Sequence, residues 1–247
     1  MATLDLAGSQ AMPGPRASAR VPARPGSILC LWIAAMVGLQ SVLWVTGFKH
    51  RSLDDAVDRG AARAEQRRTG EVGDDLIRKA IRLQRETLPF WTTLARLADF
   101  AFEPAALAAR AVAVATLFAA IAALTGRPIG FMAGLRAASW SQGFWVLSLA
   151  VTVGLMVGLR RADVETSPAL FLPPGRYPAA IILLARGADP SLLWGWLAMA
   201  WGGFRRRQVN LPTALVVCLG LMMAETTVRV GCGLIAGAGM RLSILPG

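Results

Sequence analysis

The chain has 247 residues, of which 55% are hydrophobic and 17% are charged, and its mean hydropathy is +0.49. A soluble domain usually carries about 25% charged residues, so this composition favours a helical bundle in a lipid bilayer over a water-soluble core. The net charge of +11 does not indicate nucleic acid, because the basic residues flank apolar segments, as orientation and interface anchors do, and form no single run or helical face.

Residues 1–26 are rich in proline, alanine, glycine and serine and carry few charges, which is typical of a disordered tail. The apolar segment 27–48 follows, flanked by Arg24 and Lys49, and is long enough to cross a bilayer. A cleaved signal peptide is the alternative. The apolar region is too long for one and no small-x-small cleavage site precedes Lys49, so we expect a retained anchor.

The segment 49–104 is predicted to face water, because residues 49–103 hold 11 of the 26 basic and 10 of the 15 acidic residues. Within it, 53–68 is charged nearly all round, as in a solvated helix or a disordered stretch. Asp74 and Asp75 are placed to cap an amphipathic helix. The helical period of 90–102 predicts an amphipathic helix in the membrane interface. A helix packed on a partner or on the end of the bundle fits the same pattern.

The region 105–240 is predicted to hold four further membrane helices. Two of them are 105–124, with Arg110 near one end where its side chain can snorkel to the interface, and 139–159. A short apolar helix at 177–186 precedes Asp189 and Pro190, which signal a helix start. The apolar run 191–204 covers only roughly 21 Å of the ~30 Å hydrocarbon core. Residues 177–204 are therefore either one kinked span or an interfacial helix plus a short span.

The last predicted helix covers 211–230, and 230–240 either prolongs it or turns back. The expected fold is thus all-α: a polytopic helical membrane bundle with about five transmembrane helices plus amphipathic interfacial helices. Arginine density is higher in 126–137 and 205–210, five in 18 residues, than in 160–190, four in 31. This predicts a cytoplasmic N-terminus, although Lys49, Arg51 and Arg59 argue the other way.

Glu225 and Arg229 are the most prominent polar candidates within a predicted span. Their i, i+4 spacing places them on one face of a helix, and an unpaired charge near the membrane midplane costs about 3 kcal/mol. We expect them to face each other or the bundle interior. They form either an ion- or proton-responsive site in a transporter-like cavity or a structural pair, with Arg229 able to reach the headgroups if the helix is tilted.

Several other residues are candidates for packing or anchoring. Small-xxx-small spacing predicts close helix contacts, within the chain or between copies, and Gln40 and Gln142 can hydrogen-bond between helices. The packing glycines are Gly154, Gly158, Gly233 and Gly237, and the expected interface anchors are Trp194, Trp201, Arg205, Arg206 and Arg207.

The residues that could hold a metal or cofactor are few. The lone His50 and the three cysteines, which lack CxxC spacing, predict no metal site and no disulfide framework. Nucleotide-binding, serine-hydrolase and zinc-protease motifs are missing from the sequence. We therefore expect that the protein binds no cofactor and is not an enzyme.

The order of segments resembles the Yip1 family of five-span membrane proteins. The matching residues are the linker Gly126-Arg127-Pro128-Ile129-Gly130-Phe131 with Leu135, then Asp189 with Leu192-Leu193-Trp194, and Trp201-Gly202-Gly203. The resemblance implies a helical integral-membrane scaffold, and eukaryotic members are tied to vesicle traffic and small GTPases. The arginines at 205–207, Glu225 and Arg229 depart from the family pattern.

The sequence therefore predicts a non-enzymatic membrane scaffold or accessory subunit of a larger membrane complex, with a role in trafficking or export. Its expected partners are the lipid bilayer and one or more proteins, and the alanine-, arginine- and glycine-rich composition suggests a bacterial cytoplasmic membrane. The alternative is a small transporter or channel-like protein that uses Glu225 and Arg229.

Overall fold

The computed structural model describes residues 24–55, 82–83, 85–162, 164, 166–172 and 177–239. Every element in this part of the chain is a helix. Four helical stretches are long and apolar enough to cross a membrane: Pro25–Val45, Leu88–Leu124, Phe131–Leu159 and Leu211–Ala236. The predicted tail before residue 24, the stretch 56–81 and the helix start at Asp74 and Asp75 lie outside the described residues.

The first crossing is α1 (Pro25–Val45), which is followed by a short helical stretch at 48–55. The second begins earlier than predicted. α4 (Leu88–Leu97) continues through the π-helical turn η1 (Ala98–Phe102) into α5 (Glu103–Leu124) without a break. The amphipathic pattern at 90–102 is thus the first part of a 37-residue helix and not a separate element.

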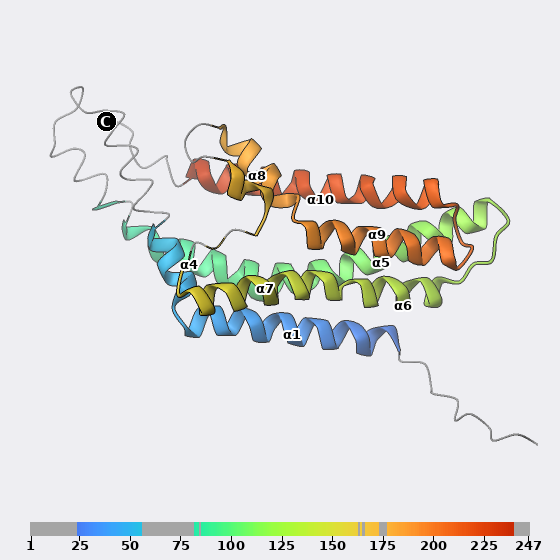
Figure 1. The fold of residues 1–247 in the computed structure, drawn as a ribbon, viewed down its shortest axis with the longest axis horizontal. Helices are drawn as coiled ribbons and strands as arrows, with labels where there is room; N and C mark the ends of the chain where they lie inside the picture. Colours follow the sequence, from blue (N-terminus) through green and yellow to red (C-terminus); the bar gives the residue numbers. More distant parts are fainter. Residues whose placement is uncertain are drawn as a thin grey trace, which may run out of the picture.

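The third crossing also begins earlier than predicted, at Phe131 instead of residue 139. It consists of α6 (Phe131–Ser141) and α7 (Gly143–Leu159), which lie nearly in line (Figure 1) and are separated by a turn at Gln142. Both flanking backbone bonds at this turn, Gln142 N–H to Ser139 O and Trp145 N–H to Gln142 O, are of the tighter i to i+3 kind. The helix is therefore interrupted near its middle.

After α7 and the short 3-10 helix η2 (Pro168–Phe171), the chain returns through α8 (Ala179–Gly187) and α9 (Pro190–Arg205). Asp189 caps α9 as predicted, its carboxylate accepting from the Ser191 backbone N–H at 2.9 Å. α9 has 16 residues and is not among the four long apolar stretches, so the expected fifth span is not confirmed. α9 nevertheless lies inside the bundle, against α6, α7 and α10 (Figure 1).

The last helix, α10 (Leu211–Gly239), is one continuous element of 29 residues. Residues 230–239 therefore prolong it, which resolves the alternative left open by the sequence. Both α8 and α9 contact α10. The side chains of Leu183 and Thr226 lie against Gly233 and Gly187, respectively, so α8 runs along the C-terminal half of α10 towards the middle of the bundle.

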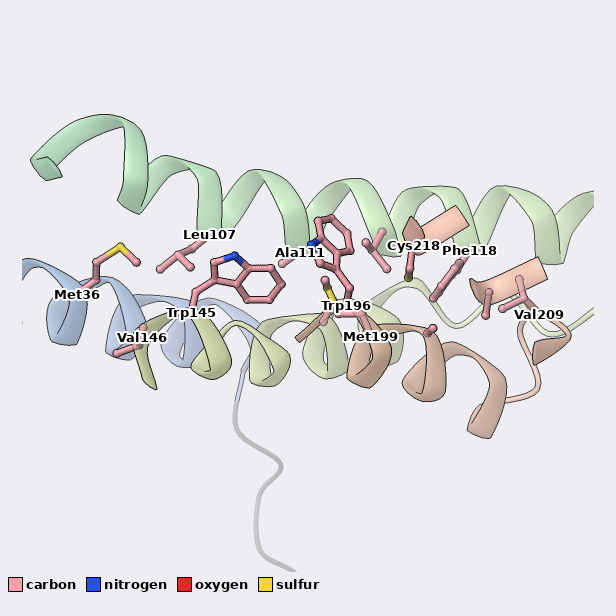
Figure 2. Close-up of a cluster of buried hydrophobic side chains, with 14 residues drawn as sticks. Met36, Leu107, Ala111, Phe118, Trp145, Val146, Trp196, Met199, Val209 and Cys218 are labelled. Carbon is pink, nitrogen blue, oxygen red and sulfur yellow. The ribbon is translucent and has the colours of Figure 1, made fainter. Parts of the chain in front are cut away.

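The core is centred on α5. Its buried residues recur at helical spacing and form a stripe that faces α1, α6, α9 and α10; they are Leu107, Ala111, Val114, Ala115, Phe118 and Ala122. Figure 2 shows Trp145 of α7 and Trp196 and Met199 of α9 extending into the space below this stripe. The two indole rings meet edge to face at 5.7 Å. α10 contributes few buried residues and presents most of its surface outward.

Glycine permits two close helix approaches that are different from those predicted. A Cβ on Gly195 would overlap the ring of Trp145, and a Cβ on Gly203 would overlap the ring of Phe118. A Cβ placed on Gly154 or Gly158 would instead meet no atom of another described element within 4 Å. The close contact expected there within the chain is not formed, so contact between copies is the alternative that stays open. Gly233 does contact α8, whereas the surroundings of Gly237 lie outside the described side chains.

These contacts predict opposite effects for two chemically identical substitutions. Gly203→Ala should lower the free energy of unfolding by about 1–3 kcal/mol, because the added methyl group would overlap the ring of the buried Phe118. Gly154→Ala should leave stability unchanged or raise it by about 0.5–1 kcal/mol, because alanine is the better helix former in open space. Denaturant unfolding in detergent micelles, followed by circular dichroism, measures both. Equal losses in the two variants would contradict the packing described here.

Candidate functional site

Four charged side chains from two helices meet in the bundle and form one connected group, which we call the charge cluster: Glu103 and Arg110 of α5, and Glu225 and Arg229 of α10. Arg110 Nε donates to Glu225 Oε2 at 2.7 Å, and Arg229 Nε donates to Glu225 Oε1 at 2.9 Å. The Arg229 guanidinium also forms a two-pronged pair with Glu103, at 2.6 and 2.9 Å. Each oxygen of both carboxylates thus accepts from an arginine.

Helix geometry explains why these residues meet. Glu103 and Arg110 are seven residues apart, which is two turns of α5, and Glu225 and Arg229 are one turn apart on α10. Each helix therefore presents one acid and one base on a single face. The helices are arranged so that opposite charges face each other. The predicted i, i+4 pair of Glu225 and Arg229 is confirmed, as half of a larger group.

The prediction that Arg110 snorkels to the interface is wrong. Because the helix extends back to Leu88, Arg110 is far from its end, and its side chain is only 5% exposed. Its Nη1 donates to Gln142 Oε1 at 3.1 Å, and its guanidinium carbon lies 4.4 Å from the ring centre of Trp145. Nη2 is buried without a hydrogen-bond partner in the described chain. Arg110 is thus held inside the bundle by one carboxylate, one amide and one indole face.

The interruption at Gln142 belongs to this arrangement. The Gln142 amide nitrogen donates to the Ala138 carbonyl at 3.2 Å and approaches Met199 Sδ of α9 at 3.5 Å, while its oxygen accepts from Arg110. Gln142 therefore connects α5, α6 and α9, as predicted for an interhelical amide. Gln40 is also buried, but its Oε1 has no partner in the described residues.

A pocket of about 220 Å³ adjoins the charge cluster at the break between α8 and α9. It is lined by side chains of α7, α8, α9 and α10; these include Trp145, Trp196, Arg186, Glu225 and Arg229. Ligand pockets for drug-sized molecules usually measure about 300–1,000 Å³. This one is smaller and has room for water or a small solute.

A second group of polar side chains, centred on Asp189, caps the buried N-terminal end of α9. The Asp189 carboxylate accepts from Ser148 Oγ of α7 at 3.2 Å and from Thr166 Oγ1 at 3.1 Å, in addition to its bonds with Ser191. Ser148 lies in the middle third of Phe131–Leu159, so α9 starts inside the bundle and not at its surface. Hydrogen-bond donors and the positive end of the α9 dipole stabilise this carboxylate.

A third group of polar side chains lies where the predicted water-facing segment leaves the bundle and returns to it. Lys49 and Asp99 form an ion pair at 3.0 Å, and Trp44 Nε1 donates to Asp99 Oδ2 at 3.0 Å. Arg96 lies over the Trp44 ring, and His50, which is exposed, meets the same ring edge to face. The two ends of the predicted polar segment therefore lie together. Groups of His, Cys, Asp or Glu able to hold a metal ion are not found among the described residues.

The predicted anchors of α9 lie on its surface. Trp194 and Trp201 are both more than half exposed. Arg205, Arg206 and Arg207 are exposed at its C-terminal end.

Sequence reasoning missed Glu103 and Trp145 as members of the site. The sequence assigns Glu103 to the end of the polar segment, because the predicted second helix begins at residue 105, whereas the observed one begins at Leu88. The seven-residue spacing of Glu103 from Arg110 was the available signal. No local pattern indicates that Trp145 stacks on Arg110, since that contact depends on how α5 and α7 pack.

Comparisons of the chain with protein-family models, with curated proteins and with solved structures gave no match. The resemblance to the Yip1 family therefore stays a prediction.

Removal of one carboxylate tests the role of the charge cluster. Glu225→Gln should lower the free energy of unfolding by about 3 kcal/mol, because it leaves the buried Arg110 without its ionic partner. Glu103→Gln should cost less than about 1 kcal/mol, because Arg229 is 43% exposed and keeps Glu225. Glu86→Gln, on the exposed part of the chain before α4, is the control with no expected change. Detergent-denaturant titration measures all three.

The double variant Arg110→Leu/Glu225→Leu should lose less stability than Glu225→Gln alone, since removing both charges leaves none unpaired. A Glu225→Gln protein that unfolds like the wild type would refute the structural role of the pair.

Proposed function

We propose that the protein is an integral-membrane scaffold or accessory subunit of a larger membrane complex, and that the charge cluster is a fixed connection between its helices. The observation that carries this proposal is the saturation of the cluster. All four carboxylate oxygens of Glu103 and Glu225 accept from Arg110 or Arg229. Two positive and two negative charges cancel, and every oxygen of the two carboxylates is engaged within the protein.

A rigid interior suits a protein whose function is to present its outer surfaces to partner proteins. The side chains of α10 lie mostly outward, and α9 exposes Trp194 and Trp201. Tryptophan is enriched at sites where proteins meet partners or the membrane interface. The charged stretch between α1 and α4 is expected from its sequence to supply the water-facing surface. The ion pair between Lys49 and Asp99 gives this segment a defined base on the bundle.

We further propose that α8 and α9 together form the fourth of five crossings, interrupted at 188–189. α7 ends at one end of the bundle and α10 begins at the other, so the chain must return between them, and α9 makes this return (Figure 1). Asp189 satisfies the inner end of α9, which makes a break at membrane depth tolerable. This arrangement is the one the Yip1 resemblance implies. It fits the expected cytoplasmic N-terminus in a bacterial cytoplasmic membrane.

The second candidate function is a small transporter or channel-like protein. The pocket favours it, because Glu225 and Arg229 line a space at a discontinuous helix, where transporters commonly bind their substrates. Glu225→Gln separates the two proposals when the variant still accumulates in membranes. A transporter loses solute flux in liposomes, whereas a scaffold retains its partners.

The scaffold proposal predicts a partner that depends on the polar segment. We would replace residues 56–81 with a Gly/Ser stretch of the same length, which leaves the pair of Lys49 and Asp99 intact. Co-purification from native membranes in mild detergent, followed by mass spectrometry, should show a stoichiometric partner with the wild type and its loss with the variant. The same replacement of residues 2–23 is the control and should keep the partner. If neither the wild type nor the control retains a partner, the scaffold proposal fails.

A further inference from the structure

One end of the bundle gathers five arginines on two joined turns and on the helices next to them. We call it the arginine end; it comprises Arg127, Arg136, Arg205, Arg206 and Arg207. The Arg127 guanidinium donates to Asn210 Oδ1, and Gln208 Nε2 donates to the Gly130 carbonyl at 2.9 Å. The turn between α5 and α6 and the turn between α9 and α10 therefore form one surface, visible at the right of Figure 1.

The described chain supplies no negative charge at this end. The stretches 118–141 and 196–224, which form the arginine end and the helices leading to it, contain no aspartate or glutamate. Three basic residues elsewhere in the described chain, Lys49, Arg110 and Arg229, each pair with a carboxylate. The arginine end is thus a concentrated positive surface with no counter-charge in the stretches 118–141 and 196–224.

The Arg206 side chain lies against the part of α6 that carries Arg136. The Arg206 side chain folds back along α9, and its Nη1 donates to the Gly202 carbonyl at 2.9 Å. A Cβ placed on Gly202 would lie 3.3 Å from Arg206 Nη1 and 3.4 Å from the Cβ of Ala137, the neighbour of Arg136. Burial, and then the positive charges of Arg136 and Arg205, lower the pKa of Arg206.

Arg136 of α6 has unused donor capacity. Its Nε is buried and has no hydrogen-bond partner among the described residues. The unpartnered Arg136 donor and the repulsion between the positive charges of Arg136 and Arg206 both raise the free energy of the ligand-free protein. An anion that accepts from both guanidiniums removes both costs. Phosphate suits this geometry, because its oxygens match the fork of donors on arginine.

Exposed indoles next to these arginines indicate that the anion is amphiphilic. Trp140 follows Arg136 by one helical turn, Trp201 precedes Arg205 by one turn, and both are more than half exposed. Indoles at this position are typical of the boundary between headgroups and acyl chains. A free phosphate ion would make no use of them.

We propose that Arg136 and Arg206, assisted by Arg205, bind the phosphate of an anionic phospholipid whose acyl chains lie beside Trp140 and Trp201. Basic sites between membrane helices are a common means of holding anionic headgroups. The site shares no residue with the pocket or with the charge cluster.

Native mass spectrometry of the full chain in mild detergent tests this site. Phosphatidylglycerol is titrated against phosphatidylcholine with the same acyl chains. The wild type should bind phosphatidylglycerol more tightly, and Arg136→Gln/Arg206→Gln should weaken that binding roughly tenfold to thirtyfold, since each arginine near a lipid surface contributes about a fivefold gain. Arg160→Gln/Arg161→Gln removes the same charge at the opposite end and should bind like the wild type.

Three outcomes overturn the proposal. The first is equal binding by the wild type and the Arg136→Gln/Arg206→Gln variant, and the second is an equal loss in the control, which indicates unspecific charge attraction. The third is displacement of the lipid by inorganic phosphate alone, which indicates a site for a soluble anion.

A second measurement needs no arginine variant. In vesicles of wild-type protein, brominated phosphatidylglycerol should quench tryptophan fluorescence more than brominated phosphatidylcholine does. Trp140→Phe/Trp201→Phe should remove the excess. Equal quenching by the two lipids would refute a local site even if the arginine variants failed to fold.

Discussion

The pairing of Arg110 is the interaction on which the rest of the bundle depends. A guanidinium that is 5% exposed among apolar helices is strongly unfavourable unless opposite charge and hydrogen-bond acceptors surround it. Glu225 supplies the charge from α10, Gln142 supplies an acceptor from the break in the third crossing, and Trp145 supplies its ring face. Three helical elements must therefore take their places around α5 before Arg110 is satisfied. This requirement fixes the rotation and the depth of α10, which has few buried apolar contacts of its own.

The same requirement explains why polar groups and broken helices occur together. The turn at Gln142 and the break at 188–189 both lie at the middle of the bundle, where unpaired backbone groups would be costly. Gln142 donates to the Ala138 carbonyl, and Asp189 accepts from the first turn of α9. Each interruption is thus satisfied by the side chain located at it. The pocket lies at the second break because α8 and α9 leave the line of a single helix there.

Much of the helical layout could be predicted from the sequence, because apolar segments long enough to span and the helix start at Asp189 are local signals. The site could be predicted only in part. The pair of Glu225 and Arg229 follows from i, i+4 spacing, but the position of Arg110 depended on where its helix begins, and 90–102 offered an amphipathic pattern that suggested a separate element. Close contacts at Gly195 and Gly203 depend on which ring of a distant helix lies opposite. That information is not present in small-xxx-small spacing, which pointed to Gly154 and Gly158.

The distribution of charge in the fold separates two tasks. Inside the bundle, Glu103, Arg110, Glu225 and Arg229 cancel, so they contribute to cohesion and add little to the net charge. At the arginine end, the stretches 118–141 and 196–224 hold no acid that offsets the positive charge, and this charge therefore acts on the surroundings. A concentration of arginine in short loops retains those loops on the cytoplasmic side during insertion. In the expected orientation, the same residues face a leaflet that is rich in anionic lipid. The expected orientation and the proposed lipid binding would then be two effects of one surface, and both require that its arginines stay without acidic partners in the protein.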